Sequence, residues 1–378
     1  MCKKTHTGLC RWSIIVALFF AACQSPEKPK EVDIVEIPEQ FEIRVSRNLK
    51  SALEFLLNNK GRLNDTVVLA KDSLVNTIYS RNQFQPIWSR QERWAPIGDS
   101  LYKFIEHSKE YGLFPSDYHY RALTGLRYMI ATDSIAHRDA ALWSRADLML
   151  TDAFLQLCKH LKQGHLNYDS VTLRTDTVLK DEFYTTVFDQ LKFTHNIRGV
   201  LQTLEPVNFN YVALKAALKQ FLDSVGPFRR LTFVQYPQSD TAALYASLQR
   251  RLFEEDILLS PSDSLSAESW RQAIITYQNR KGLKETGRPN LNTVNALNFT
   301  DWQKFKRAAV TLDRYRLLPD TMPHTYIWVN VPAYNLKVID ADTVALESRV
   351  IVGTPKTRTP LLTSQVSNFI TYPQWTVP

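Results

Sequence analysis

The spacing of apolar residues changes once along this chain, from a helical period to a strand period. Between residues 139 and 162, apolar side chains recur every three or four positions through three turns, which predicts one long helix with a buried stripe: Leu150, Ala153, Phe154, Leu157, Cys158 and Leu161. From residue 327 onward apolar and polar residues alternate, as they do in strands. The sequence therefore predicts a multidomain α+β chain that is helical through most of its length and β-rich at its C-terminal end.

The chain is long enough to bury more than one core. Its 378 residues are 44% hydrophobic and 11% aromatic, which suits two or three domains and argues against disorder throughout. The formal charge is +8, and Lys3, Lys4 and Arg11 fall in a segment predicted to be removed, so the mature chain carries about +5. This mild excess suits an anionic partner such as a cell-wall polymer or lipid headgroups. Because no dense Lys/Arg run is present, nucleic acid is not a predicted partner.

The first 22 residues have the order of an export signal. Cations precede an apolar run, residues 12–22, that is too short to span the roughly 30 Å core of a bilayer. The run ends Phe20-Ala21-Ala22-Cys23, which resembles a bacterial lipobox in which leucine is usual at the place of Phe20. The resemblance implies that signal peptide 1–22 is removed, that Cys23 is lipidated and anchors the chain to a membrane, and that residues 23–40, rich in Pro, Glu and Lys, form a tether. The alternative is an ordinary cleaved signal in which Cys23 is incidental.

Cysteine usage leaves one candidate nucleophile. Two cysteines lie in the predicted signal and Cys23 would carry lipid, so only Cys158 remains and no internal disulfide is available. Cys158 lies near His160 and His165, and a cysteine with a histidine can act as nucleophile and base. However, Cys158 is on the apolar stripe whereas His160 points about 200° around the helix, so we predict a buried structural thiol. The other histidines show no ligand spacing, and we predict no metal site and no cofactor.

Residues 41–225 are predicted to form a helical scaffold domain. Asp99 and Ser100 offer caps for a helix that would continue through Leu101, and Gly112 stands where a helix C′ residue belongs. The long helix described above is predicted to end at Gly164.

Residues 242–299 are predicted to form a second, smaller helical unit. Three helical faces are expected, with Asn292 or Thr293 near the cap of the third; the first two faces comprise Leu244, Leu248, Leu252 and Ile257, then Trp270, Ala273, Ile274, Tyr277 and Gln278. This pattern, with Gly282, Gly287 and Leu297, resembles the three-helix peptidoglycan-binding domain of cell-wall enzymes. The alternative is a plain helical hairpin that acts as a spacer. Aromatic rings and cations could contact a sugar-peptide polymer, and the candidate residues are Trp270, Arg271, Tyr277, Arg280 and Lys281. Of these, Tyr277 is the one we most expect to lie in the core instead.

A connecting helix within 301–323 is predicted to lead into a β unit, residues 324–378. On the helix, Asp313, Arg314 and Arg316 are expected to be solvated or paired with the following domain. The turn Asp340-Ala341-Asp342 should join two strands, and residues 361–376 should give further strand. The expected apolar faces are Ile327, Val329 and Val331, then Leu336 and Val338, then Val344, Leu346, Ser348, Val350 and Val352.

The chain after residue 45 resembles the large periplasmic L,D-transpeptidases of Gram-negative bacteria. The stretches that carry the resemblance are residues 78–89, 112–119, 150–167 and 312–319, together with VNVPAYNLKVID and ESRVIVGTPKTRTP. The family joins a helical scaffold domain and a peptidoglycan-binding domain to a β-rich catalytic domain, which cross-links or modifies peptidoglycan by thiol acyl transfer without a cofactor. The resemblance implies a location in the cell envelope of a Gram-negative bacterium, in the periplasm and attached to the outer membrane.

The residues of that chemistry are missing from this sequence. Acyl transfer needs a thiolate, a histidine base and backbone N–H groups that hold the oxyanion. The family supplies them from a His and a later Ser-His-Gly-x-Cys-Gly-type motif, but no Cys or His follows His324 here. We therefore predict no catalytic residue, an incomplete catalytic domain, and no activity for the chain as given, with Tyr372 and Trp375 at the rim of a substrate cleft. The alternatives are that the β unit is a complete small binding domain, and that the protein is a non-catalytic envelope lipoprotein that binds peptidoglycan and acts as a scaffold.

Overall fold

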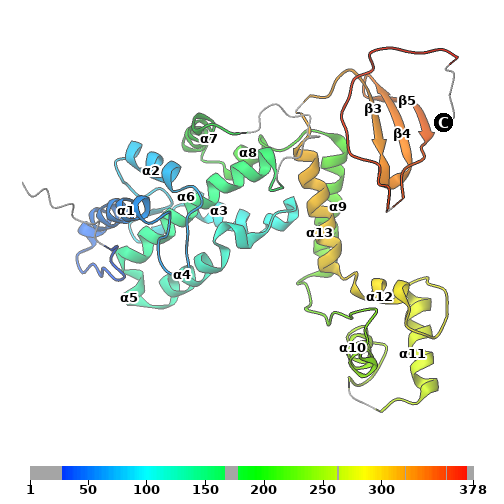
Figure 1. Ribbon diagram of the computed structural model, residues 1–378. Helices are drawn as coiled ribbons and strands as arrows, with labels where there is room; N and C mark the ends of the chain where they lie inside the picture. Colours follow the sequence, from blue (N-terminus) through cyan, green and yellow to red (C-terminus); the bar gives the residue numbers. More distant parts are fainter. Residues whose placement is uncertain (1–27, 167–177, 262–263, 320, 355, 373–378) are drawn as a thin grey trace, which may run out of the picture.

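A computed structural model describes residues 28–166, 178–261, 264–319, 321–354 and 356–372. Cys23 and Trp375 therefore lie outside the described residues. In Figure 1 a pair of long helices, α9 (Phe209–Val225) and α13 (Asp301–Arg316), stands between a large helical body, a three-helix unit and a small sheet. Helices make up most of the described secondary structure and the three-stranded sheet comes last, which confirms the α+β class predicted from the change of period.

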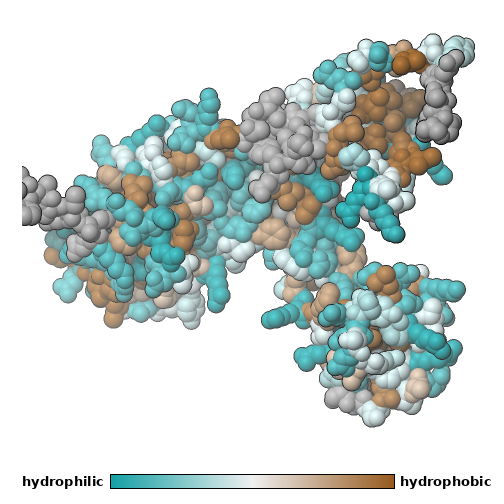
Figure 2. Space-filling view, viewed as in Figure 1, coloured by the Kyte–Doolittle hydropathy of each residue, from teal (hydrophilic) through white to brown (hydrophobic). Residues whose placement is uncertain are grey.

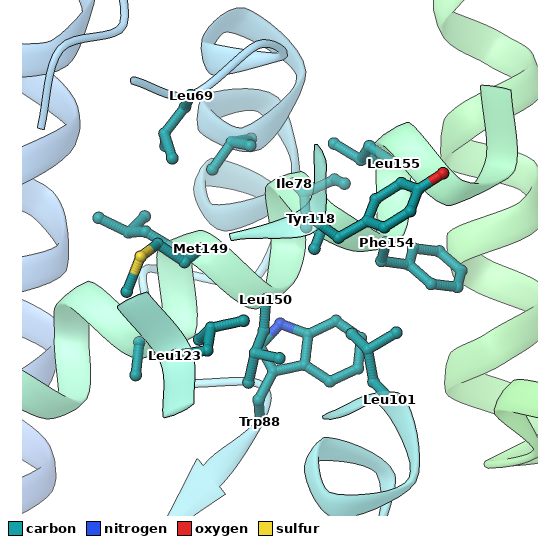
Figure 3. Close-up of a cluster of buried hydrophobic side chains, with 14 of the residues drawn as sticks. Leu69, Ile78, Trp88, Leu101, Tyr118, Leu123, Met149, Leu150, Phe154 and Leu155 are labelled. Atoms are coloured by element: carbon teal, nitrogen blue, oxygen red, sulfur yellow. The ribbon is translucent and has the colours of Figure 1, made fainter. Parts of the chain in front are cut away.

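The helical body is built around α6 (Ala140–Gln163), and it holds the largest hydrophobic core. Twenty of the 24 residues of α6 are buried, so the polar side chains on this helix need partners inside the protein. Figure 3 shows part of this core, in which Leu150, Phe154 and Leu155 of α6 lie among Trp88, Leu101 and Tyr118. The other helices of the body are α1 (Phe41–Asn58), α2 (Asp72–Arg81), α3 (Pro96–Glu106), α4 (Tyr120–Thr132), α5 (Ser134–His137), α7 (Asp181–Thr194) and α8 (Ile197–Gln202).

Short elements complete the body and its ends. Strands β1 (Ser89–Arg90) and β2 (Arg93–Trp94) form a two-stranded hairpin, and 3-10 turns occur at η1 (Pro38–Gln40), η2 (Ser108–Tyr111) and η3 (Pro115–Tyr118). Within the described residues, no helix is both long and apolar enough to cross a membrane.

The predicted start of α3 is wrong by about one turn. The helix begins at Pro96, whose fixed φ and missing N–H suit a first helical position, and its N-cap is Ala95. Asp99 and Ser100 therefore lie inside the helix, where Asp99 binds Arg127 at 2.6 Å and the Ser100 hydroxyl donates to the carbonyl of Pro96. Gly112 has the left-handed conformation expected of it, φ 68°, and ends η2, the turn that follows α3.

Asp147 is the polar centre of the helical body. Its carboxylate accepts hydrogen bonds from the hydroxyls of Tyr79 and Ser89 and from the backbone N–H groups of Ile87 and Trp88. Burial raises the pKa of Asp147 to about 6, even though these hydrogen bonds favour the ionised form. One carboxylate on α6 thus fixes α2 and the segment that leads into β1.

The three-helix unit has a core of its own. It comprises α10 (Thr241–Glu254), α11 (Ala267–Arg280) and α12 (Leu291–Asn298), and its buried cluster is Val234, Leu244, Leu248, Leu252, Ala273, Ile274, Tyr277, Val294 and Leu297. The cap predicted for the third helix is wrong by two or three residues, because Asn290 precedes α12 and accepts from the N–H of Thr293. Ile257 lies beyond the end of α10 and is only partly buried.

Helix α13 is joined to the helical body by a buried polar contact. Asp313 accepts from the N–H groups of His165 (2.8 Å) and Leu166 (2.7 Å) and pairs with Arg316 at 3.3 Å. Gly164 permits this approach, because a Cβ there would lie 2.9 Å from a carboxylate oxygen of Asp313.

The expectation that this charged group is solvated or paired with the following domain is wrong for two of its three residues. Asp313 is 5% exposed and Arg316 is fully buried, and both face the helical body and α9; Arg316 also donates to the carbonyl of Tyr111 and the hydroxyl of Tyr211. Only Arg314 is exposed. The reason is the helical period, since Ala309, Leu312, Asp313 and Arg316 form one buried stripe at i, i+3, i+4 and i+7.

The C-terminal sheet is an antiparallel meander in the order β3 (Thr325–Asn330), β4 (Asn335–Asp340) and β5 (Thr343–Arg349). Of the predicted turn Asp340-Ala341-Asp342, the last two residues form the turn, both with positive φ, and Asp340 ends β4. Val331 lies in η4 (Val331–Ala333) between β3 and β4. Residues 350–354 and 356–372 contain no strand, so the strand predicted for 361–376 is wrong as far as residue 372.

The sheet register corrects the predicted apolar face of β5. Leu346 lies opposite Val338 whereas Val344 lies opposite Ile339, with a β-bulge between the two pairs. Because neighbouring residues of β4 point to opposite faces, the bulge places Val344 and Leu346 on different faces. Among the described residues, no side chain of this sheet belongs to a buried hydrophobic cluster. The apolar surface over the sheet is visible in Figure 2.

Candidate functional site

A pocket of about 310 Å³ opens where the three-helix unit meets the start of α13. The ends of α10, α11 and α12 contribute to it, together with Arg229 and Leu231 of the preceding segment. Its volume is at the lower end of the range typical of small-ligand sites. Charged side chains dominate the wall, among them Arg229, Arg251, Glu255, Arg280, Lys281 and Lys304.

Arg251 is the buried residue of this pocket. Its side chain is 1% exposed, donates to the carbonyl of Leu297 at 2.8 Å and pairs with Glu255 at 2.7 Å. Two of its nitrogens, Nε and Nη1, are out of contact with water and have no hydrogen-bond partner among the described residues. The hydroxyl of Tyr277 is likewise buried without a hydrogen-bond partner among the described residues. Lys281 adds a second cation 3.4 Å from Glu255.

These charges and the burial act on Glu255 of the pocket wall and on Tyr277, a core residue outside that wall. Burial favours the neutral form of Glu255, but Arg251 and Lys281 outweigh it and hold the pKa of Glu255 below its usual value. Burial raises the pKa of Tyr277, so its hydroxyl stays protonated and able to donate. The pocket is therefore lined by both cations and carboxylates, and the carboxylate of Glu255 is ionised and already paired.

The structure separates the residues predicted to contact peptidoglycan. Arg280 and Lys281 line the pocket, whereas Arg271 lies elsewhere on α11, exposed and paired with Glu268. Trp270 is half-buried and packs edge-on against Tyr245. Tyr277 is fully buried, so its ring is not available to a ligand and belongs to the core.

The sequence did not lead us to predict a role for Arg251, although its position on the helix indicates burial. It follows Leu248 by three positions and precedes Leu252, so it occupies the apolar stripe of α10. A cation on such a stripe needs a buried partner, and Glu255, four residues later, supplies it.

Gln278, a buried polar residue of α11, has a structural role. Its side-chain amide donates to the hydroxyls of Thr286 and Thr293 at 2.9 Å, and its oxygen accepts from the N–H groups of Thr286 and Gly287. It thus holds the segment between α11 and α12 against the core.

Cys158 and its neighbouring histidines do not form a nucleophile and base. Cys158 is fully buried and burial raises its pKa, so the side chain is a thiol rather than a reactive thiolate. His160 is also buried, 2.8 Å from the hydroxyl of Tyr118 and 3.3 Å from His165, and burial lowers its pKa to about 3. The prediction of a buried thiol is confirmed, and both groups are neutral near pH 7.

The sheet contributes exposed apolar residues rather than a formed site. Tyr372, predicted at the rim of a cleft, is 96% exposed, and Trp375 lies outside the described residues. His324 precedes β3 and lies 3.2 Å from Asp340 at the surface. In the part of the chain that the structure describes, no group of three or more His, Cys, Asp or Glu side chains is placed to hold a metal ion.

Comparison with known sequences assigns families to three parts of the chain. A family described as "Scaffold domain" matches residues 73–218, a "Putative peptidoglycan binding domain" matches 240–297, and an "L,D-transpeptidase catalytic domain" matches 324–378. One relative, a "Putative L,D-transpeptidase" of Haemophilus influenzae, is 41% identical over 73 residues, which cover 19% of this chain and 14% of the relative. The exact boundaries predicted above stay predictions.

The three matches follow the order expected from the resemblance, and the middle one coincides with the unit that contains α10, α11 and α12 and has its own core. The chain thus matches, in this order, the models of a scaffold domain, a peptidoglycan-binding domain and an L,D-transpeptidase catalytic domain.

Proposed function

We propose that this protein attaches to peptidoglycan through α10–α12 and belongs to the machinery that cross-links or remodels that polymer by acyl transfer between stem peptides. The observation that carries the proposal is the independent three-helix unit, with its own core and a charged pocket, between sequences of the scaffold and catalytic types. The helical body would hold this unit and the sheet at a fixed distance through α9 and α13.

We further propose that these 378 residues bind rather than catalyse. Acyl transfer in this family requires a reactive thiolate, and the cysteine that the structure describes is buried with a raised pKa. No Cys or His follows His324 in the sequence. A binding role also suits the alternative weighed from the sequence, a non-catalytic peptidoglycan-binding lipoprotein, in which Cys23 would be the lipid anchor and the periplasmic face of the outer membrane the location.

Co-sedimentation with purified sacculi tests the binding proposal. The purified chain should pellet with sacculi, and Leu248→Asp should abolish this, because it places a carboxylate in the core of the three-helix unit. The core of the helical body is separate, so its thermal transition should persist in the variant and show that the rest of the chain is folded. Equal pelleting of the two proteins would refute attachment through this unit.

A further inference from the structure

The wall of the pocket between the three-helix unit and α13 includes a buried arginine whose donors lack acceptors. The Arg251 Nε and Nη1 atoms and the Tyr277 hydroxyl are buried without partners among the described residues. A buried donor that is left unsatisfied destabilises the protein, and more so when the group is charged. Arg251 forms part of the pocket wall, so an acceptor bound in the pocket would complete the hydrogen bonds of this side chain.

The charge at the pocket also favours an anion. Five cations and four carboxylates line it, and three of the four carboxylates already lie in ion pairs: Glu254 with Arg250, Glu255 with Arg251 and Lys281, and Asp301 with Lys304. Among the described residues, Arg229 and Arg280 lie in no ion pair, and the latter donates only to the backbone carbonyl of Glu255, at 2.6 Å. An incoming carboxylate would meet these charges without first displacing a partner carboxylate.

The remaining wall is apolar and aromatic. Phe299, Trp302 and Leu231 line the pocket beside the cations, and Trp302 stacks on Phe305 of α13 at a centroid distance of 5.3 Å. A wall of this kind suits a carboxylate carried on an organic residue better than a bare inorganic anion, because the aliphatic part of the ligand can cover the ring surface. The volume of about 310 Å³ suits a fragment of two or three small residues.

We propose that this pocket binds a carboxylate of a peptidoglycan stem peptide, with Arg280 and Lys281 at its mouth and Arg251 in its wall. The inference rests on the proposed function and specifies which part of the polymer the three-helix unit recognises. Because α13 supplies Trp302 and Lys304, a bound peptide contacts both the unit and the helix that leads toward the sheet.

Titration calorimetry of the full chain with a soluble muropeptide tests this assignment. The same muropeptide with its carboxyl groups amidated is the matched ligand, and free D-alanine tests whether an isolated amino acid suffices. We expect amidation to weaken binding at least about tenfold, the size of one lost charge-assisted hydrogen bond. D-alanine should bind much more weakly than the muropeptide, because it leaves most of the pocket empty.

Two variants of α11 complete the design. Arg280→Glu should lose at least about tenfold in muropeptide affinity, and Lys281→Gln should also weaken binding. Arg271→Glu makes the same charge change on an exposed residue of the same helix, away from the pocket, and should stay within about twofold of the unmodified chain. Circular dichroism confirms that each variant is folded.

The outcomes are distinguishable from those of the sacculus assay. Equal muropeptide binding by Arg280→Glu and Arg271→Glu, or equal binding of the amidated ligand, would overturn the carboxylate site even if sacculi are bound. D-alanine binding as tight as the muropeptide would overturn the stem peptide as the source of the carboxylate. Failure of sacculus binding with intact muropeptide binding would instead contradict attachment to the polymer while leaving the pocket assignment supported.

Discussion

Replacing Asp313 with alanine should loosen the joint between α13 and the helical body. The carboxylate accepts from two backbone N–H groups at 2.7 and 2.8 Å and faces Arg316, which is fully buried. Removing one member of a buried ion pair typically costs about 3–5 kcal/mol, because the remaining charge keeps its desolvation penalty. We therefore expect Asp313→Ala to lower the free energy of unfolding by about 4 kcal/mol, a large share of a typical domain's stability.

The matched control is on the same helix. Asp301 pairs with Lys304 at 2.9 Å, but both side chains are about half exposed, and exposed pairs contribute about 0–1 kcal/mol. Asp301→Ala should therefore cost less than about 1 kcal/mol. The double variant Asp313→Ala/Arg316→Met should recover part of the loss, since an apolar replacement of the whole pair removes the stranded charge.

Urea unfolding followed by circular dichroism, with limited proteolysis of the folded variants, measures these differences. Proteases should cleave the segment after α6 or the ends of α13 faster in Asp313→Ala, because the contact with the N–H groups of His165 and Leu166 is lost. If Asp313→Ala destabilises the protein no more than Asp301→Ala does, the buried joint does not hold α13 in place and the reasoning fails.

Three further predictions concern single residues. The 378-residue chain should form no adduct with a carbapenem, an acylating agent of the catalytic cysteine of L,D-transpeptidases, when its intact mass is measured. A stoichiometric adduct that vanishes in Cys158→Ala would show that the thiol is reactive. Because the folded-state pKa of Asp147 is raised to about 6 from 3.8, the native state binds this proton more tightly than the unfolded chain, so stability should fall by up to about 3 kcal/mol as pH rises from about 4 to 6. Asp147→Asn should abolish that slope in urea titrations, and an unchanged slope would assign it to other groups. Mass spectrometry of the protein expressed in a bacterium that processes lipoproteins should find Cys23 as a lipidated N-terminus, and an unmodified chain that starts elsewhere would contradict the anchor.

Much of the helical part could be predicted because its signals are periodic and local. The apolar stripe of α6 predicted both ends of this helix to within one residue and placed Cys158 in the core, since a buried helix carries apolar residues at every turn. The same reasoning identified the faces of α10 and α11. Helix starts were less accurate, because Asp99, Asn292 and Thr293 are acceptable caps in isolation and the backbone of the preceding residues decides between them.

The candidate site depended on contacts that a single sequence does not encode locally. Arg251, Asp313 and Arg316 are charged residues on apolar stripes, and a periodicity rule that treats charge as solvent-facing places them on the wrong side. Some of their partners are local, Glu255 for Arg251 and Arg316 for Asp313, whereas others are backbone carbonyls of distant segments, such as those of Leu297 and Tyr111. A rule that asks which charges interrupt a buried stripe would have found all three.

The exposed face of the sheet leads to a last prediction. One cross-strand row joins all three strands, Ile327 opposite Val338 and Val338 opposite Leu346, and its outer members are 52% and 54% exposed. Such a row attracts other apolar surfaces, and burying one leucine is worth on the order of 1.5–3 kcal/mol. Leu346→Lys should therefore weaken self-association of the chain about tenfold or more in sedimentation velocity. Glu347→Gln raises the net charge by the same unit on the opposite face, so it separates the effect of charge from that of the apolar row. If both variants associate equally, net charge rather than this row controls the behaviour of the sheet.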